Sequence, residues 1–195
     1  MYQVRLHGRG GQGVVTAAEL IASAAIADGR YALAFPSFGS ERTGAPVAAY
    51  CRIDDKPIRS REPVTDPDTV IVLDPTLLRQ LFVFDGLKPG GTALVNSAAP
   101  VTAAGMALCE IHVRTVPGSE IARDRTGRPL PNAAMVGAFA ATGIVTLASV
   151  RGAITARFAG RIAEANCQAA DDAYDHLSRA DAAPVPSSRQ EADNV

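Results

Sequence analysis

A glycine-rich segment near the amino terminus, Gly8-Arg9-Gly10-Gly11-Gln12-Gly13, has the residue types and spacing of a loop that binds an anion. It follows a predicted strand and opens a predicted helix. Glycines let the backbone turn tightly and approach an anion closely, and the first N–H groups of a helix have no partner within the helix. Arg9 could add a positive charge. The acidic residue that holds the ribose in dinucleotide-binding folds is absent, because the corresponding region, 31–35, reads Tyr-Ala-Leu-Ala-Phe.

Three interpretations of this loop stay open from the sequence. The loop could bind NAD or FAD, although the ribose-binding residue is missing. It could be a tight turn between a strand and a helix in a Rossmann-like fold that binds no nucleotide. It could also line the ligand site of another subunit.

A second segment, 35–47, combines a Glu41-Arg42 pair with flanking glycines in a loop that leaves the end of a predicted strand. Ligands of α/β sheets bind at this position. Arg42 could clamp a carboxylate or a phosphate, and Glu41 could orient it or accept a proton. The alternative is an ion pair on a surface turn. No histidine or cysteine lies nearby in the sequence to complete a nucleophilic site.

Two asparagines are also candidates. Asn132 follows Pro131 and precedes an apolar helix, so we expect it to cap that helix rather than to contact a ligand. Asn166 lies in the last predicted helix, where we expect it to bond a backbone group.

Histidine and cysteine positions argue against a metal or redox centre held by this chain alone. The histidines have no metal-ligand spacing, and the cysteines form no C-x-x-C pair (His7, His112, His176; Cys51, Cys109, Cys167). An odd number of cysteines and an N-terminus without an apolar run predict a cytoplasmic protein.

The elements that position these residues alternate along the chain. Strands are predicted at 2–7, 31–35, 47–53, 68–74, 92–96 and 111–115, and helices at 14–28, 76–84, 133–150 and 155–178. Segment 117–124 is predicted to start a short helix or a lid. We expect the strands at 2–7 and 31–35 to form a right-handed βαβ unit, 47–53 to join an antiparallel or edge hairpin, and the last two helices to meet near Arg151-Gly152. The fold class is α/β: a three-layer Rossmann-like domain with a mostly parallel sheet and a C-terminal helical pair, covering 1–179, with a disordered tail at 180–195.

Composition excludes several function classes. The 195 residues carry a formal net charge of −1, which disfavours nucleic acid or an anionic membrane as the main partner. Segment 133–150 has no charge, but it is mostly alanine with Gly137 and Gly143, so we expect a buried helix rather than a membrane span.

Four sequence blocks carry a family resemblance. Residues 8–14, 35–47, 131–138, and Glu164-Ala165-Asn166 with Ala173-Tyr174 resemble the gamma subunit of 2-oxoacid:ferredoxin oxidoreductases, especially the pyruvate or 2-ketoisovalerate branch. The similarity runs in order over about residues 1–178. Thr43 stands where that family often has Arg or Gly.

The resemblance implies one subunit of a complex that decarboxylates a 2-oxoacid on thiamine diphosphate with magnesium, passes electrons through [4Fe–4S] clusters to ferredoxin or NAD, and forms acyl-CoA. The implied partners are alpha, beta and ferredoxin-like delta subunits, with FAD on a further subunit if NAD is the acceptor. We expect no catalytic or metal-binding residue in this chain alone. The alternatives are a free-standing nucleotide-binding module and a purely structural interaction protein. Candidate ligand or interface residues are Gly8, Arg9, Gly10, Gly11, Gln12, Gly13, Phe38, Glu41, Arg42, Thr43 and Asn132.

Overall fold

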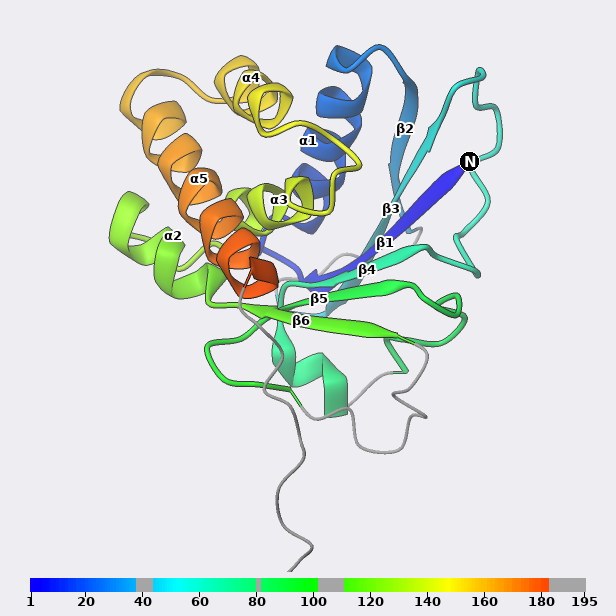
Figure 1. The fold of residues 1–195 in the computed structure, drawn as a ribbon, viewed down its shortest axis with the longest axis horizontal. Helices are drawn as coiled ribbons and strands as arrows, with labels where there is room; N and C mark the ends of the chain where they lie inside the picture. Colours follow the sequence, from blue (N-terminus) through cyan, green and yellow to red (C-terminus); the bar gives the residue numbers. More distant parts are fainter. Residues whose placement is uncertain (38–43, 80–81, 102–110, 183–195) are drawn as a thin grey trace, which may run out of the picture.

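The computed structural model describes residues 1–37, 44–79, 82–101 and 111–182, with side chains through residue 180. These residues form a six-stranded sheet in the order β2-β3-β1-β4-β5-β6 (Figure 1). The strands are β1 (Tyr2–Arg9), β2 (Tyr31–Pro36), β3 (Pro46–Asp54), β4 (Thr69–Val72), β5 (Thr92–Asn96) and β6 (His112–Val116). The α/β class with a mostly parallel sheet is confirmed.

The position of β3 differs from the predicted order. Strands β1, β4, β5 and β6 pair in parallel, whereas β3 runs antiparallel to both β1 and β2. The predicted antiparallel direction of this segment is confirmed, but its edge position is wrong, because β3 is an internal strand that lies between β1 and β2. Its burial explains this, because Cys51 and Ile53 face the helices while Tyr50 and Arg52 are buried on the opposite face. A strand buried on both faces belongs inside a sheet.

Five α-helices of the described chain lie on one face of the sheet (Figure 1). They are α1 (Val14–Ala27), α2 (Gly118–Thr126), α3 (Asn132–Ala140), α4 (Leu147–Arg157) and α5 (Gly160–Ala182). Every residue of α3 is buried, and α3 packs against both α1 and α5. A Cβ at Gly137 would lie 2.1 Å from the carbonyl oxygen of Ala170, so α3 and α5 approach more closely than a side chain would allow. The predicted burial of this helix is confirmed for α3.

The opposite face of the sheet is covered by a short 3-10 helix, η1 (Pro75–Arg79), and irregular chain rather than by the helix predicted at 76–84. Turns with N–H to carbonyl bonds from Asp85 to Phe82 and from Leu87 to Phe84 follow in the described part of this segment. The buried Arg5 guanidinium donates to the carbonyl oxygen of Val83 at 3.1 Å and also to that of Asp85. A continuous helix would use these carbonyl groups internally, so Arg5 stabilises the turns instead.

The uncharged segment 133–150 forms two helices, and the predicted C-terminal pair is therefore a set of three. Gly143 has a φ of +79°, which ends the helical path, and the Thr146 hydroxyl caps α4 by accepting from the Ser149 N–H at 3.2 Å. Arg151 and Gly152, the expected joint, lie inside α4. Across the described residues, no helix combines the length and the apolar character needed to cross a membrane.

The last helix, α5, extends to Ala182. It therefore runs past the domain end predicted at 179. Residues 183–195 of the predicted tail lie outside the described residues.

Candidate functional site

The candidate residues gather where the parallel strands end. The glycine loop 8–13 follows β1 closely, Asp74 follows β4, and Asn96 ends β5. The chain leaves β1 through α1 towards β2 on one side of the sheet, while β4 pairs with β1 on the other side. The carboxyl ends of β1 and β4 therefore form a topological switch point, the place where open α/β sheets bind ligands.

Arg9 forms an ion pair and two hydrogen bonds at this edge of the sheet. Its Nε lies 3.2 Å from Asp74 Oδ2, its Nη1 donates to the carbonyl oxygen of Gly44 at 3.0 Å, and its Nη2 donates to the hydroxyl of Thr76 at 2.9 Å. Arg9 therefore brings no unpaired positive charge, because the Asp74 carboxylate balances it. That Arg9 adds positive charge to an anion site stays a prediction.

Asp74 organises the glycine loop. Its Oδ2 accepts from Gln12 Nε2 at 2.8 Å, and its Oδ1 accepts from the backbone N–H and the hydroxyl of Thr76 at 2.9 and 2.6 Å. Gln12 also accepts from the backbone N–H of Arg9 at 2.8 Å through Oε1. Burial alone would raise the pKa of Asp74, but the bonds from Thr76 and Gln12 and the charge of Arg9 lower that pKa below its usual value. The carboxylate is thus ionised and fixed near neutral pH.

Glycine is needed at different positions of the loop for different structural reasons. Gly11 and Gly13 have φ of +95° and +75°, a backbone region that other residues rarely adopt. A Cβ at Gly8 would lie 2.6 Å from Cγ2 of Val14, so Gly8 is required for α1 to pack against the end of β1. Close packing of the turn therefore accounts for Gly8 without a nucleotide.

The sheet order also lacks a strand arrangement that dinucleotide binding requires. In that fold the strand beside the first one ends in the residue that holds the ribose. Here the neighbour of β1 on that side is the antiparallel β3, and β2 lies one strand further away and ends at Pro36. The NAD or FAD interpretation thus lacks both its residue and its strand arrangement.

Asn132 does not cap α3. It is the first residue of that helix, Pro131 occupies the cap position, and no side-chain capping bond forms. The Asn132 side chain instead reaches Gly13, the cap residue of α1, because its Nδ2 lies 2.7 Å from where a Cβ of Gly13 would be. It is 9% exposed, and within the described chain its carboxamide has no hydrogen-bond partner. The structure thus brings Asn132 and the glycine loop together.

The second predicted segment is only partly visible. Phe38, Glu41, Arg42 and Thr43 lie outside the described residues. The chain that follows them is bonded to the glycine loop: the Gly10 N–H donates to the Ala45 carbonyl at 2.9 Å, and the Gly44 N–H donates to the Gly10 carbonyl at 3.1 Å. The two family motifs therefore meet at the end of β1.

Two site residues were missed from the sequence, namely Asp74 and Thr76. The sequence does contain a signal for Asp74. It is an acidic residue directly after an apolar strand, which places it at the carboxyl end of the sheet. Asn96 has a similar position, but its amide is fully used for structure. It donates to the carbonyl oxygen of Leu73 and to the Ser119 hydroxyl, and it accepts from the Ser119 N–H.

His7 precedes the glycine loop and lies in β1. Its Nε2 is buried and has no partner among the described residues. Burial, together with the nearby charge of Arg5, lowers the pKa of His7 to about 4. The imidazole is therefore neutral near pH 7.

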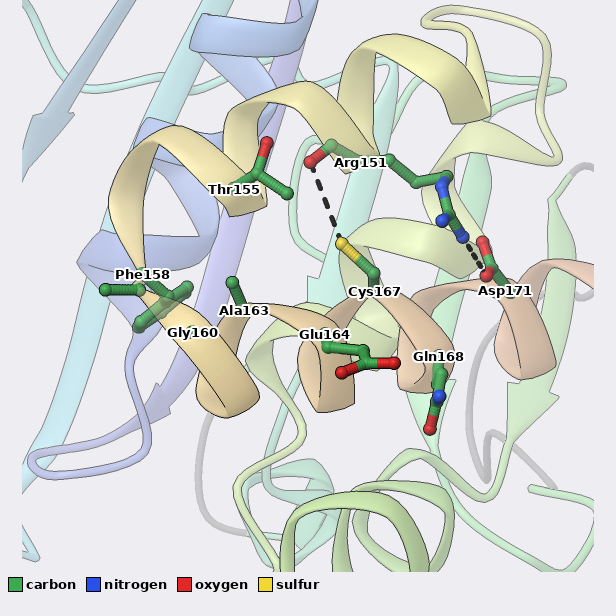
Figure 2. Close-up of a pocket in the computed structure, with 10 residues that line it drawn as sticks. Arg151, Thr155, Phe158, Gly160, Ala163, Glu164, Cys167, Gln168 and Asp171 are labelled. Carbon is green, nitrogen blue, oxygen red and sulfur yellow. Dashed lines mark hydrogen bonds and ion pairs between the residues drawn. The ribbon is translucent and has the colours of Figure 1, made fainter.

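A separate groove of about 610 Å³ lies between α4 and α5 (Figure 2). Arg151 and Asp171 form an ion pair on its wall, and Cys167 Sγ lies 3.7 Å from the carbonyl oxygen of Arg151. Burial raises the pKa of the Cys167 thiol, which makes it a weak nucleophile. None of the predicted site residues lines this groove.

No metal centre is present in the described part of the chain, where no group of three or more His, Cys, Asp or Glu side chains converges. Cys51 and Cys167 are both buried free thiols on different elements, and Cys109 lies outside the described residues. With three cysteines in all, the chain cannot supply four thiolates to a [4Fe–4S] cluster.

Comparison with known families decides the relationship. Residues 3–176 match the family model described as pyruvate ferredoxin/flavodoxin oxidoreductase. The chain belongs to this family. It is 45% identical over 180 residues to pyruvate synthase subunit PorC of Methanothermobacter thermautotrophicus, covering 92% of this chain and 97% of that protein. It is 47% identical over 177 residues to the pyruvate/ketoisovalerate oxidoreductases common subunit gamma of Thermococcus kodakarensis, covering 89% and 96% of the two chains.

Two solved structures share this fold, and the first of them is also similar in sequence. The pyruvate oxidoreductase subunit PORC of Thermotoga maritima superposes with a TM-score of 0.76 and 34% identity, covering 89% of this chain and 95% of that chain. A 2-oxoglutarate:ferredoxin oxidoreductase of Magnetococcus marinus shares the fold with a TM-score of 0.74 at 18% identity, covering 92% of this chain and 31% of that chain. The homologues are thus gamma subunits of 2-oxoacid:ferredoxin oxidoreductases, as the sequence motifs indicated.

Proposed function

We propose that this chain is the gamma subunit of a complex that oxidatively decarboxylates a 2-oxoacid to acyl-CoA and CO2. The observation that carries this proposal is the 45% identity to PorC over 97% of that protein's length. The chain matches a complete subunit and leaves little of it unaccounted for. Electrons would pass to ferredoxin, or to NAD through a further flavin subunit.

The cofactors are assigned to companion subunits. The donor set of the described residues fits neither an iron–sulfur cluster nor a metal ion, and the sequence lacks the Gly-Asp-Gly and asparagine pattern that holds thiamine diphosphate with magnesium. Alpha, beta and ferredoxin-like delta subunits would carry thiamine diphosphate, magnesium and [4Fe–4S] clusters. No step of the chemistry is assigned to a side chain of this subunit.

This chain would contribute a wall of the ligand cleft. The support is the switch point between β1 and β4, where the glycine loop, the 44–45 segment and Asn132 lie together. Because Asp74 fixes both Arg9 and Gln12, the loop is held in one conformation before a ligand arrives. A preformed wall lowers the entropy cost of binding coenzyme A or the 2-oxoacid.

Co-expression of the chain with alpha, beta and delta subunits of the family tests the proposal. We expect all four to co-purify in fixed proportion, and we expect the isolated chain to be inactive with pyruvate and coenzyme A. An isolated chain that stays apart from the other subunits, or that is active alone, would refute it. In an intact complex, Glu41→Ala and Arg42→Ala should lower turnover without dissociating the subunits, and unchanged kinetics would restrict that segment to architecture.

A further inference from the structure

Strand β2 is an edge of the sheet, and alternate backbone groups of this strand point away from the sheet (Figure 1). The Ser37 N–H donates to the Ala48 carbonyl at 2.9 Å, which continues the antiparallel pairing of β2 with β3. Bonded and outward residues alternate along such a strand, and Ala32 and Ala34 fall on the outward positions. Their N–H and C=O groups therefore face the side of β2 where the sheet of the described chain has no further strand.

This edge lacks the features by which proteins protect an open strand. Natural edge strands carry charged side chains, bulges or prolines that discourage pairing with another chain. The sequence of β2, Tyr-Ala-Leu-Ala-Phe-Pro, contains no charge, and only Pro36 at its end lacks an N–H. The opposite edge strand, β6, carries His112 and Arg114. The two edges of the sheet thus differ, and β2 is the one that suits a further strand.

Apolar side chains lie beside the open edge. Ile26 and Tyr31 are 57% and 50% exposed, and they lie on the two sides of the short turn that joins α1 to β2. Leu33 is partly buried against a cluster that contains Phe35 and Tyr50. Side chains of a strand alternate between its faces, so Tyr31, Leu33 and Phe35 share the face of the sheet opposite to the helices. A strand added at this edge covers an apolar row.

We propose that β2 pairs antiparallel with β2 of a second copy of this chain, so that two subunits share one continuous sheet. A two-fold axis at Leu33 places Ala32 of each copy opposite Ala34 of the other. This register uses every outward N–H and C=O group of these two residues in both copies. Pro36 ends the pairing, because it has no N–H to donate. The inference goes beyond the proposed function, since it joins two complexes through this chain.

The side chains of β2 are complementary to themselves in this register. Tyr31 lies opposite Phe35 of the second copy, and Phe35 already packs on Tyr50 with ring centroids 5.3 Å apart. Leu33 faces its own counterpart between the two aromatic pairs, and apolar cross-strand pairs of this kind stabilise a sheet. No like charges meet, because the strand has none. A two-fold pairing also uses up the open edge, so the assembly stops at a dimer.

Sedimentation velocity of the full-length chain over a range of concentrations tests the proposal. One strand pair is a small interface, so we expect a reversible dimer with a dissociation constant of about 100 μM or tighter. The N–H groups of Ala32 and Ala34 should exchange with solvent more slowly as the concentration rises. A chain that stays monomeric at about 1 mM, or exchange that is independent of concentration, would overturn the proposal. Protection of these groups only after companion subunits are added would assign the edge to those subunits and overturn it as well.

Leu33→Lys separates pairing through β2 from any other association. Its ammonium groups meet across the two-fold axis, and like charges directly opposite each other destabilise a strand pair. The lysine stem still covers the apolar cluster, so we expect a folded chain with at least about ten-fold weaker dimerisation. His112→Lys on the other edge strand, β6, is the matched control and should dimerise like wild type.

A Leu33→Lys dimer as stable as the wild-type dimer would contradict the proposal. If Leu33→Lys does not fold, the amide exchange of the wild type at Ala32 and Ala34 decides the question. None of these measurements depends on the activity of a complex, so the failure of this proposal is distinguishable from a failure of the proposed function.

Discussion

The contact between Gly13 and Asn132 can be measured by a double-mutant cycle. Gly13→Ala has two separate costs in this structure. The φ of +75° costs about 1–2 kcal/mol for a residue with a Cβ. The new Cβ would also lie 2.7 Å from Asn132 Nδ2 and 3.1 Å from its Cγ, and overpacking of this kind costs about 1–3 kcal/mol. The single substitution should therefore lower the free energy of unfolding by about 2–5 kcal/mol.

In an Asn132→Ala background only the backbone cost and a mild contact remain. The Cβ of residue 132 would still lie 3.2 Å from the new Cβ, while Nδ2 and Cγ are gone. Gly13→Ala should then cost about 1–2 kcal/mol, which gives a coupling of at least about 1 kcal/mol. Urea unfolding of the four chains measures both values. Equal costs of Gly13→Ala in the two backgrounds would refute the placement of Asn132 against α1.

Three further substitutions test other parts of the structure. Gly137→Ala should lower the free energy of unfolding by about 1–3 kcal/mol, because the new Cβ would clash with the backbone of Ala170. An unchanged melting temperature would contradict the close packing of α3 and α5. The free energy of unfolding of the wild type should fall by up to about 3 kcal/mol between pH 6.5 and pH 4, because the unfolded chain protonates His7 more readily than the folded chain does. His7→Leu should remove this pH dependence. Parallel pH profiles of the two proteins would disprove it. Asp74→Asn should cost about 1–3 kcal/mol at pH 7, because its amide N–H2 opposes donors of Arg9 and Gln12. The difference from wild type should shrink as the pH falls below about 4, since Asp74 has a lowered pKa in the folded chain and the unfolded chain therefore binds the proton first. Equal urea midpoints at pH 7 would argue against the network.

Much of the fold was predictable because its signals are local. The strand that precedes the glycine loop, the apolar strand β4 and the end of α1 at Gly29 follow from periodicity and helix terminators. The placement of β3 was not predictable in the same way, because pairing of distant strands depends on burial of both faces. The break between α3 and α4 was signalled by Gly143 and Thr146, but the uncharged run around them suggested one helix.

The candidate site, like the fold, was only partly predictable from the sequence. The glycine loop was recognised from its spacing, whereas its backbone bonds to Gly44 and Ala45 were not predicted. The role of Asp74 depends on β1 and β4 being neighbours, which no local pattern reveals. Asn132 was expected to cap its own helix, but Pro131 takes the cap position and frees the carboxamide to reach Gly13. Tertiary contacts thus decide which polar residues serve the site.

An omission and add-back assay tests the proposed role of the chain most directly. A complex assembled from alpha, beta and delta subunits is assayed for pyruvate oxidation that depends on coenzyme A and reduces ferredoxin, first without this chain and then after it is added. We expect little activity without the chain and recovery at one equivalent per alpha subunit. Full activity in its absence, or no response to its addition, would contradict its role as a required subunit.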